Sequence, residues 1–355
     1  MDSRAGAEPR PGYPVFQSAV TIPTFRLIFF SVSLALLLSP LAVRIAPRLR
    51  LIDVPGSLPH KQHARSVPLM GGWVLLLTLL AVGAPTLAGS TTEIVPILAS
   101  SLIVFLFGVV DDRIGLSAPY KLVGQGAASA VLILSGVQVQ LFSPGLNWAN
   151  LLITVVWLVG ITNAFNFVDS MDGLAVGLAA LSSGFFMLVA LESGQNELSY
   201  LSAAMMGACI GVYFFNVNPA RLFIGDAGSQ WLGFMLAAVG IVYTPVGFLR
   251  SQSWFVPILL VGVPIFDTVL IVYSRLRRRR PLFRASLDHT YHRLVHFGVD
   301  SVRSVLAMHM TALLLNCLAF ILLTSTPLWA NILFAAILAG GGVLLVWMDG
   351  RVRWT

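Results

Sequence analysis

Long apolar segments separated by short polar connections run along almost the whole chain. Eleven of them are long enough for an α-helix to cross the roughly 30 Å hydrocarbon core of a bilayer. These segments are 24–46, 69–88, 94–110, 121–137, 149–168, 173–191, 199–216, 229–246, 254–274, 302–323 and 328–347. The pattern predicts an all-α, polytopic membrane protein with about 11 transmembrane helices. Residues 21–355 are expected to form a single transmembrane domain, after a disordered N-terminal tail at 1–20.

The composition agrees with this prediction. Of the 355 residues, 57% are hydrophobic and only 10% are charged, and the mean hydropathy is +0.86. A soluble protein carries about 25% charged residues. The two cysteines, Cys209 and Cys317, lie inside apolar segments, which favours small core residues over a disulfide framework or a metal site. The composition therefore excludes the soluble classes of protein.

Basic residues are distributed unevenly between the two sides of the predicted domain. If the connections alternate between the sides, 18 of the 22 Lys and Arg residues fall on the side opposite the N-terminus. The positive-inside rule makes that side cytoplasmic, with the N-terminus outside and the C-terminus inside. This asymmetry accounts for the net charge of +7 without a nucleic-acid partner. Several aspartates fall on the same side, so the cytoplasmic face has the composition of a site for a metal and phosphate groups.

Four polar residues interrupt two apolar segments at regular spacing. Asn163, Asn166, Asp169 and Asp172 follow one another at intervals of three, so a continuous helix would place all four on one face. Oxygen donors grouped at the edge of a membrane suit a hard cation and a nucleotide. The alternative is an interfacial loop in which Asn and Asp cap the helix ends.

An adjacent pair of acids, Asp111 and Asp112, ends the third apolar segment. A helix C-terminus disfavours negative charge, and carboxylates held together raise one another's pKa, which suits a general base. The alternative is a solvated pair of loop acids. Lys121, at the start of the next segment, is placed to meet a phosphate. Lys61 and His63 add cationic groups to the same side, although alone they would indicate only a basic loop.

Asp226 precedes the eighth apolar segment in the run Gly225-Asp-Ala-Gly228-Ser. It could cap the N-terminus of the following helix. The flanking glycines instead allow phosphate groups to approach the backbone at a helix N-terminus, which favours anions. We therefore favour a metal ligand over a cap at this position.

The ninth connection contains His289, His292 and Arg293, a combination that can grip a pyrophosphate. A zinc site is the alternative, but neither Cys nor Glu accompanies these histidines. The arginines at 277–280 are expected to face anionic lipid headgroups. Asp267 lies inside the ninth segment, where an acid is functional by default, although its surroundings indicate no particular role.

In this order, the motifs resemble those of the polyprenyl-phosphate N-acetylhexosamine-1-phosphate transferases, the family of MraY, WecA and TagO. The matching motifs are Asp-Asp with Leu116-Ser117 and Lys121, Asn-x-x-Asn-x-x-Asp-x-x-Asp-Gly-Leu, Phe-x-Gly-Asp-x-Gly-Ser, and His-x-x-His-Arg-Leu. The match to the family runs from about residue 50 to residue 295. The resemblance implies a multi-pass enzyme of the bacterial cytoplasmic membrane with its active site on the cytoplasmic face.

The resemblance also implies the reaction and its requirements. Such enzymes transfer a sugar 1-phosphate from a UDP-N-acetylhexosamine to a polyprenyl phosphate such as undecaprenyl phosphate, release UMP and need Mg²⁺ (or Mn²⁺). This is the first membrane step in making a cell-envelope polysaccharide, such as lipopolysaccharide or teichoic acid. A homodimer is a further expectation.

Residue roles follow from the resemblance by position. Asp111 and Asp112 match the catalytic pair that activates the lipid phosphate, and Asn166 and Asp226 match the metal ligands. The expected nucleotide contacts are Asn163, Asp169 and Asp172. The expected phosphate and sugar contacts are Lys61, His63, Lys121, His289, His292 and Arg293.

Some positions depart from the family pattern. Tyr291 replaces a common His, and Ser170 and Met171 replace the usual Gly and Leu or Ile. The His-His-His-Phe-Glu loop of the MraY branch is absent, which favours the WecA and TagO branch and UDP-GlcNAc as donor. A phospho-MurNAc-pentapeptide transferase stays open as an alternative. So does a membrane transporter, which would hold its acids at mid-span, as only Asp267 is placed here.

Overall fold

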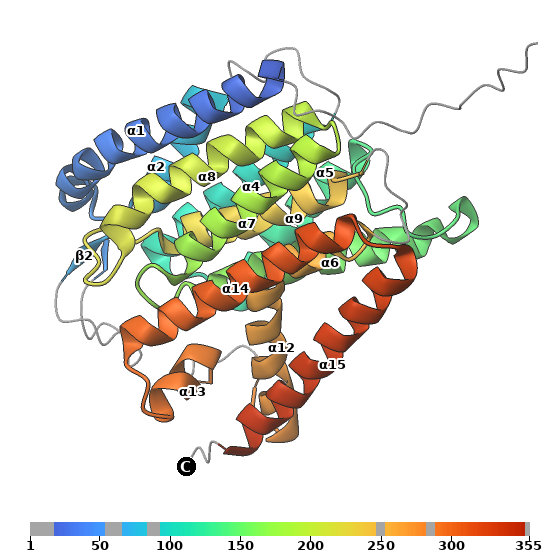
Figure 1. Ribbon diagram of the computed structural model, residues 1–355. Helices are drawn as coiled ribbons and strands as arrows, with labels where there is room; N and C mark the ends of the chain where they lie inside the picture. The colour runs from blue at the N-terminus through green and yellow to red at the C-terminus, as the bar shows by residue number, and fades with distance from the viewer. Residues whose placement is uncertain (1–17, 54–65, 84–92, 246–252, 282–287, 352–355) are drawn as a thin grey trace, which may run out of the picture.

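The computed structural model describes residues 18–53, 66–83, 93–245, 253–281 and 288–351, most of which are helical (Figure 1). The longer helices are α1 (Ser18–Leu49), α4 (Ile94–Ile114), α5 (Ala118–Leu134), α6 (Asn147–Val168), α7 (Leu174–Glu192), α8 (Asn196–Asn216), α9 (Gly225–Val242), α12 (Gly262–Arg277), α14 (Ser301–Leu323) and α15 (Pro327–Arg351). The shorter ones are α2 (Gly71–Thr78), the π-helix η1 (Leu79–Gly83), the 3₁₀ turn η2 (Pro144–Leu146), α11 (Val256–Leu260) and α13 (Thr290–His296). Two short antiparallel strands, β1 (Ile52–Asp53) and β2 (Val67–Pro68), complete the described part.

Each of the eleven predicted segments contains helix, so the prediction of an all-α membrane protein is confirmed. Within the described residues, seven helical stretches are long and apolar enough to cross a membrane. They are Pro23–Leu49, Ile94–Ile114, Pro144–Val168, Leu174–Glu192, Asn196–Asn216, Ser301–Leu323 and Pro327–Arg351. The chain is therefore a multi-pass membrane protein.

Helix α9 is the central element of the bundle and lies behind α7 in Figure 1. It packs against α2, α4, α6 and α7, and 15 of its 18 residues are buried. A helix that is apolar on all sides is stable only when other elements surround it. The polar residues of α9, Asp226, Ser229 and Gln230, are confined to its first two turns. The packing of α9 thus fixes these side chains where several other helices end.

Close backbone contact fixes the start of α9. A Cβ atom at Gly72 of α2 would lie 2.6 Å from the Gly228 nitrogen, closer than any side chain tolerates. The amide of Gly72 donates to the Ile224 carbonyl (3.1 Å), and that of Gly71 donates to the Phe223 carbonyl (2.8 Å). The segment before α9 is therefore tied to the connection between β2 and α2.

The ninth segment was expected to be one helix but is two. Pro264 has no amide hydrogen, so the Leu260 carbonyl, four residues earlier, has no donor within the helix. The Ser182 hydroxyl of α7 donates to that carbonyl instead (2.6 Å). The break separates α11 from α12, and α12 leaves the bundle below α14 (Figure 1). As a result, Asp267 on α12 lies near α13.

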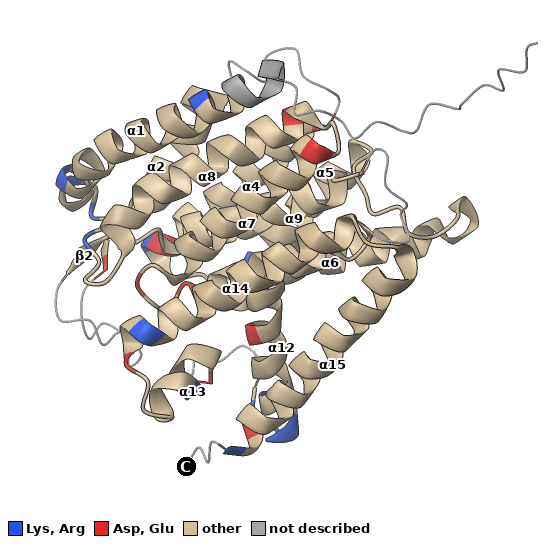
Figure 2. Cartoon of the chain, in the orientation of Figure 1, with Lys and Arg blue, Asp and Glu red and all other residues tan. Residues whose placement is uncertain are grey.

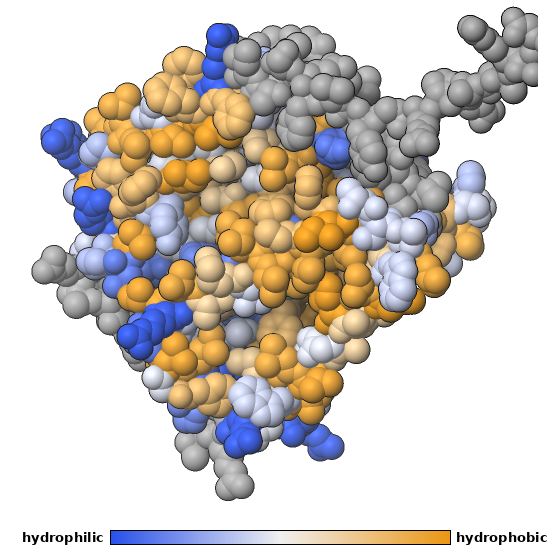
Figure 3. All heavy atoms as spheres, viewed as in Figure 1, coloured by the Kyte–Doolittle hydropathy of each residue, from blue (hydrophilic) through white to orange (hydrophobic). Residues whose placement is uncertain are grey.

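The distribution of side chains suits a bilayer. Figure 2 shows few charged residues along the middle of the helices; most lie near helix ends and around α12 and α13. Figure 3 shows a hydrophobic belt across the visible face, with hydrophilic side chains along its left and lower margins. Helix α15 runs diagonally at the lower right of Figure 1 and exposes large apolar residues such as Leu328, Val343 and Trp347. Lipid is the natural solvent for such a surface.

Candidate active site

The C-terminal ends of α4 and α6 meet the N-terminal ends of α5 and α9 at one cluster of charged and amide side chains. The Lys121 ammonium forms ion pairs with Asp111 and with Asp226 Oδ1, the latter at 3.0 Å. The Asn166 Nδ2 atom donates to the same Asp226 oxygen at 2.6 Å. Four helices that are distant in the sequence thus contribute to one polar site.

Asp112 holds α9 in place. Its Oδ1 accepts from the Asp226 amide (2.7 Å) and its Oδ2 from the Ala227 amide (3.1 Å). A carboxylate that accepts from the first amides of a helix satisfies donors that lack an intrahelical partner. Gly225 has a φ of +69°, and a Cβ there would lie 2.6 Å from Asp112 Oδ2, so this cap requires glycine.

Asp111 has a different environment. It is only 5% exposed, its Oδ1 accepts from the Leu116 amide (2.7 Å), and its Oδ2 pairs with Lys121. The alternative of a pair of solvated loop acids is therefore wrong. The two neighbouring carboxylates point to different partners, Asp112 to the α9 backbone and Asp111 to the Lys121 ammonium.

The side-chain amide of Asn166 is oriented so that its nitrogen makes hydrogen bonds and its oxygen remains for a ligand. Nδ2 donates to Asp226 and to the Ser229 hydroxyl (3.0 Å), while Oδ1 accepts no hydrogen bond within the described residues. Oδ1 of Asn166 and the second oxygen of Asp226 are hard donors. In the part of the chain that the structure describes, no group of three or more His, Cys, Asp or Glu could hold a metal ion. A site with few protein ligands suits Mg²⁺, because this ion binds through one or two carboxylates together with waters and substrate phosphates.

Asn163, a predicted nucleotide contact, lies one turn deeper. Its Nδ2 donates to Gln125 Oε1 (2.7 Å), and Gln125 in turn donates to Gln230 Oε1 (3.0 Å). This network joins α5, α6 and α9 directly beneath the site. Asn163 therefore supports the site from below. Neither Gln125 nor Gln230 belongs to a recognised motif, although an amide inside an apolar segment is itself a signal.

Helix α6 ends at Val168, so Asp169 and Asp172 lie in the turn that follows and not on one continuous helical face. The Asp172 Oδ2 atom accepts from Asn218 Nδ2 (3.2 Å) and the Ala220 amide (3.0 Å), which fixes the connection between α8 and α9. Burial, and then the negative charge of Asp226, raises the pKa of Asp169 well above its usual range. A cation bound nearby would favour the ionised form of Asp169.

The histidine loop differs most from expectation. Arg293 is completely buried, and its guanidinium donates to the Asp288 carbonyl (3.0 Å), the Met348 carbonyl (3.1 Å) and Asp349 Oδ1 (3.2 Å). Asp349, on the last helix, also pairs with Arg277 and Arg278. Arg293 is therefore not placed to contact phosphate: it fastens α13 to α15. Sequence spacing could not reveal this pairing.

The two histidines of the loop have different neighbours. His292 Nε2 bonds to the Tyr291 hydroxyl (2.7 Å). Burial lowers the pKa of His292 to about 4, so this imidazole is neutral near pH 7. The His289 ring packs edge-on against Phe167, next to Asn166 in the sequence (centroids 6.3 Å). His289 is thus the member of the loop that borders the site, while Lys61 and His63 lie outside the described residues.

Arg293→Ala is expected to lower the stability of the protein by about 3–5 kcal/mol, because it removes the donor to the Asp288 and Met348 carbonyls as well as one partner of the buried Asp349. Thermal unfolding in detergent would measure this loss. Arg303→Ala is the matched control: the Arg303 side chain is 82% exposed in its pair with Asp300, and such pairs contribute about 0–1 kcal/mol. An unchanged melting temperature in Arg293→Ala, together with weaker nucleotide binding, would contradict the assignment.

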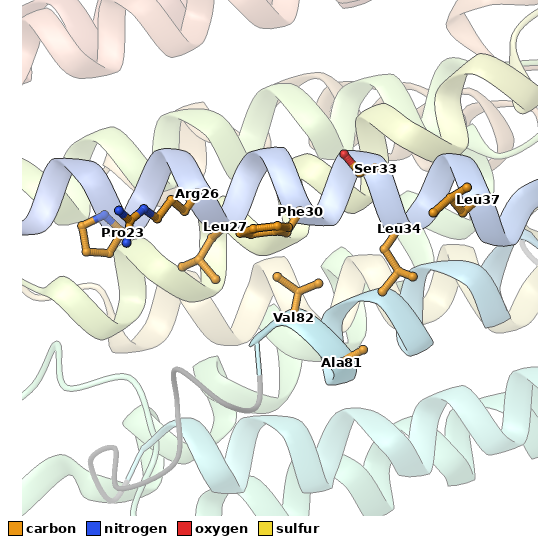
Figure 4. Close-up of a pocket in the computed structure, with 9 residues that line it drawn as sticks. All are labelled: Pro23, Arg26, Leu27, Phe30, Ser33, Leu34, Leu37, Ala81 and Val82. Carbon is orange, nitrogen blue, oxygen red and sulfur yellow. The ribbon is translucent and has the colours of Figure 1, made fainter.

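A separate hollow of about 630 Å³ lies between α1 and η1 (Figure 4). Its walls are apolar side chains such as Phe30, Leu34 and Val82, with Arg26 at one end. None of the polar residues of the cluster lines it. Its composition is that of a lipid-facing surface, so the candidate active site is the polar cluster.

Comparisons with known proteins point in one direction. The profile of the family described as Glycosyl transferase family 4 matches residues 94–244, which include most of the cluster. The chain is 30% identical over 324 residues to a probable undecaprenyl-phosphate N-acetylglucosaminyl 1-phosphate transferase of Bacillus subtilis, covering 88% of each chain. It is 32% identical over 287 residues to a decaprenyl-phosphate N-acetylglucosaminephosphotransferase of Mycobacterium tuberculosis, covering 70% of each. It is also 29% identical over 298 residues to a phospho-N-acetylmuramoyl-pentapeptide-transferase of Shouchella clausii, covering 76% of this chain and 88% of that one.

Proposed function

The chain belongs to glycosyl transferase family 4, and we propose that it transfers N-acetylglucosamine 1-phosphate from UDP-GlcNAc to a polyprenyl phosphate, releasing UMP. The observation that carries this proposal is the contact of Lys121 with both Asp111 and Asp226, with Asn166 on the same carboxylate. The site combines acids, an ammonium group and amide oxygens at the ends of membrane helices. That combination suits phosphoryl transfer between a charged donor and a lipid acceptor.

Asn166 and Asp226 are the residues that would hold Mg²⁺. The Asn166 Oδ1 atom and the second Asp226 oxygen supply two hard ligands, and substrate phosphates and water supply the others. When bound there, the ion would offset the charge of the donor's pyrophosphate. The contacts of Asn166 with Asp226 and Ser229 keep the amide in the orientation that this role requires.

The remaining groups act on the acceptor and the leaving group. Lys121 is the cation nearest the two carboxylates, and on substrate binding it would transfer its contacts to phosphate oxygens. Asp111, released from Lys121, accepts the proton of the lipid phosphate or orients it. An oxygen of that phosphate then attacks the β-phosphorus, and the bond between the β-phosphorus and the bridging oxygen breaks, so UMP leaves.

A panel of donors tests this proposal. Purified protein, undecaprenyl phosphate and Mg²⁺ would be incubated separately with UDP-GlcNAc, UDP-GalNAc and UDP-MurNAc-pentapeptide. We expect UMP and a lipid-linked sugar from UDP-GlcNAc. Product only from UDP-MurNAc-pentapeptide would favour the second candidate, which the similarity to the Shouchella clausii protein supports. No UMP from any donor would contradict both.

The N-terminus is proposed to lie outside and the C-terminus inside, which places the active site on the cytoplasmic face of the bacterial inner membrane. Ser301 is the first residue of α14, and Thr326 lies just beyond its last residue, Leu323. Both are exposed, so they give a matched pair for a test of the topology. In a variant without Cys209 and Cys317, an impermeant thiol reagent should label Thr326→Cys in intact cells. It should label Ser301→Cys only after permeabilisation. The reverse pattern would invert the topology.

A further inference from the structure

One buried acid has no part in the chemistry described above. Asp267 lies on α12 and is completely buried. A carboxylate removed from water is costly unless other groups pair with it. A buried acid in an apolar segment therefore requires partners, and Asp267 has two.

Both oxygens of Asp267 contact the histidine loop. Oδ2 lies 2.9 Å from His289 Nδ1, and Oδ1 accepts from the Thr290 amide at 2.6 Å. Because a carboxylate can only accept, the Nδ1 atom of His289 must carry a hydrogen. This leaves Nε2, which makes no hydrogen bond within the described residues, as the atom available to a ligand.

Aromatic contacts fix the direction of the same ring. The imidazole stacks on Tyr291 (centroids 5.6 Å, planes 18° apart) and meets the edge of Phe167 (6.3 Å, 70°). Phe167 lies between Asn166 and Asp169 at the end of α6. His289 is therefore held at the border of the polar cluster by a carboxylate on one side and by rings on two others.

We propose that Asp267 is a positioning residue, whose carboxylate fixes the tautomer and orientation of His289 so that the Nε2 lone pair accepts from a hydroxyl or amide N–H of the donor's sugar. The identity of that ligand rests on the proposed function, whereas the tautomer does not. A carboxylate that orients an imidazole in this way commonly changes the function of the imidazole by about 10–100-fold.

The competing explanation is that Asp267 only anchors the start of α13 through Thr290. Asp267→Asn separates the two. The amide oxygen of Asn can still accept from the Thr290 amide, but the amide nitrogen now donates to Nδ1 and moves the imidazole hydrogen to Nε2. The anchor is kept while the tautomer is reversed.

The experiment is a double-mutant cycle with an independent reading of the tautomer. We expect Asp267→Asn to lose about 10–100-fold in kcat/KM for UDP-GlcNAc, with an unchanged melting temperature. In a His289→Gln background, the same substitution should cause no further loss, because its effect acts through the imidazole. Asp349→Asn is the matched control: it removes a buried carboxylate that holds α13 through Arg293, so its loss should add to that of His289→Gln.

The tautomer is read from imidazole ¹⁵N shifts, with the His289 signals identified by their loss in His289→Gln. We expect a hydrogen on Nδ1 in the wild type and on Nε2 in Asp267→Asn. A bare Nδ1 in the wild type, or additive losses for Asp267→Asn and His289→Gln, would overturn the inference. The wild-type turnover separates the two proposals: failure to form UMP refutes the proposed function, and the shifts still test the role of Asp267.

Discussion

Asp226→Asn is expected to abolish turnover. Asp226 is the residue on which Lys121, Asn166 and the Asp112-capped backbone of α9 converge. The substitution preserves the shape of the side chain but removes a hard anionic ligand, so the affinity for Mg²⁺ falls together with the rate. We expect at least about a 10²–10³-fold loss of kcat, the size associated with one electrostatic group in a preorganised site.

Release of UMP from UDP-GlcNAc, measured across a Mg²⁺ titration, would test this expectation. EDTA should stop the wild-type enzyme, and Mg²⁺ should restore it. The fold should survive in Asp226→Asn, because Asp112 binds the backbone amide of residue 226 and not its side chain. Ser229→Ala is the matched control: within the described residues, the Ser229 hydroxyl makes hydrogen bonds with Asn166 and the Gly225 carbonyl, so its loss should cost less. Full activity with an unchanged titration would refute the metal assignment.

The sequence was a good guide to the helices and to the place where polar groups gather. Hydropathy located the helices that can cross a membrane, because lipid imposes the same requirement on each one, but it missed the short helix α13 and the division of the ninth segment into α11 and α12. The acids at 111, 112 and 226 were predicted to share one site, and the structure brings them together around Lys121. What the structure corrects are partnerships between residues far apart in the chain.

Three cases show the reason. The break before α12 depends on Pro264, but its stability depends on Ser182 of α7, which no local pattern identifies. Arg293 has the chemistry of a phosphate ligand, but it forms an ion pair with Asp349 on the last helix. Asn163 lies three residues before Asn166, but one turn deeper in the bundle, and its side chain donates a hydrogen bond to Gln125. Spacing reveals which residues can share a face, and only packing decides what that face meets.

The last prediction concerns the two neighbouring carboxylates, which the sequence treats as equivalent. Asp111 contacts the side chain of Lys121, whereas both oxygens of Asp112 accept from backbone amides of α9. The residue that can exchange its partner for a substrate is Asp111. We therefore expect Asp111→Asn to lower kcat by about 10²–10⁴-fold, as for loss of a positioned base. Binding of UDP-GlcNAc and thermal stability should change little, because Asn can still accept from the Leu116 amide.

Asp112→Asn should behave differently. Its amide nitrogen would face a backbone N–H of α9, so one of the two capping hydrogen bonds is lost and the helix start is displaced. Loss of such a cap costs about 0.5–2 kcal/mol, and the displacement carries Asp226 with it. The melting temperature and UDP-GlcNAc binding should therefore both fall along with kcat. Calorimetric titration with UDP-GlcNAc and thermal unfolding of the two variants would test this division. If Asp111→Asn loses donor binding while Asp112→Asn keeps both binding and stability, the two roles are reversed.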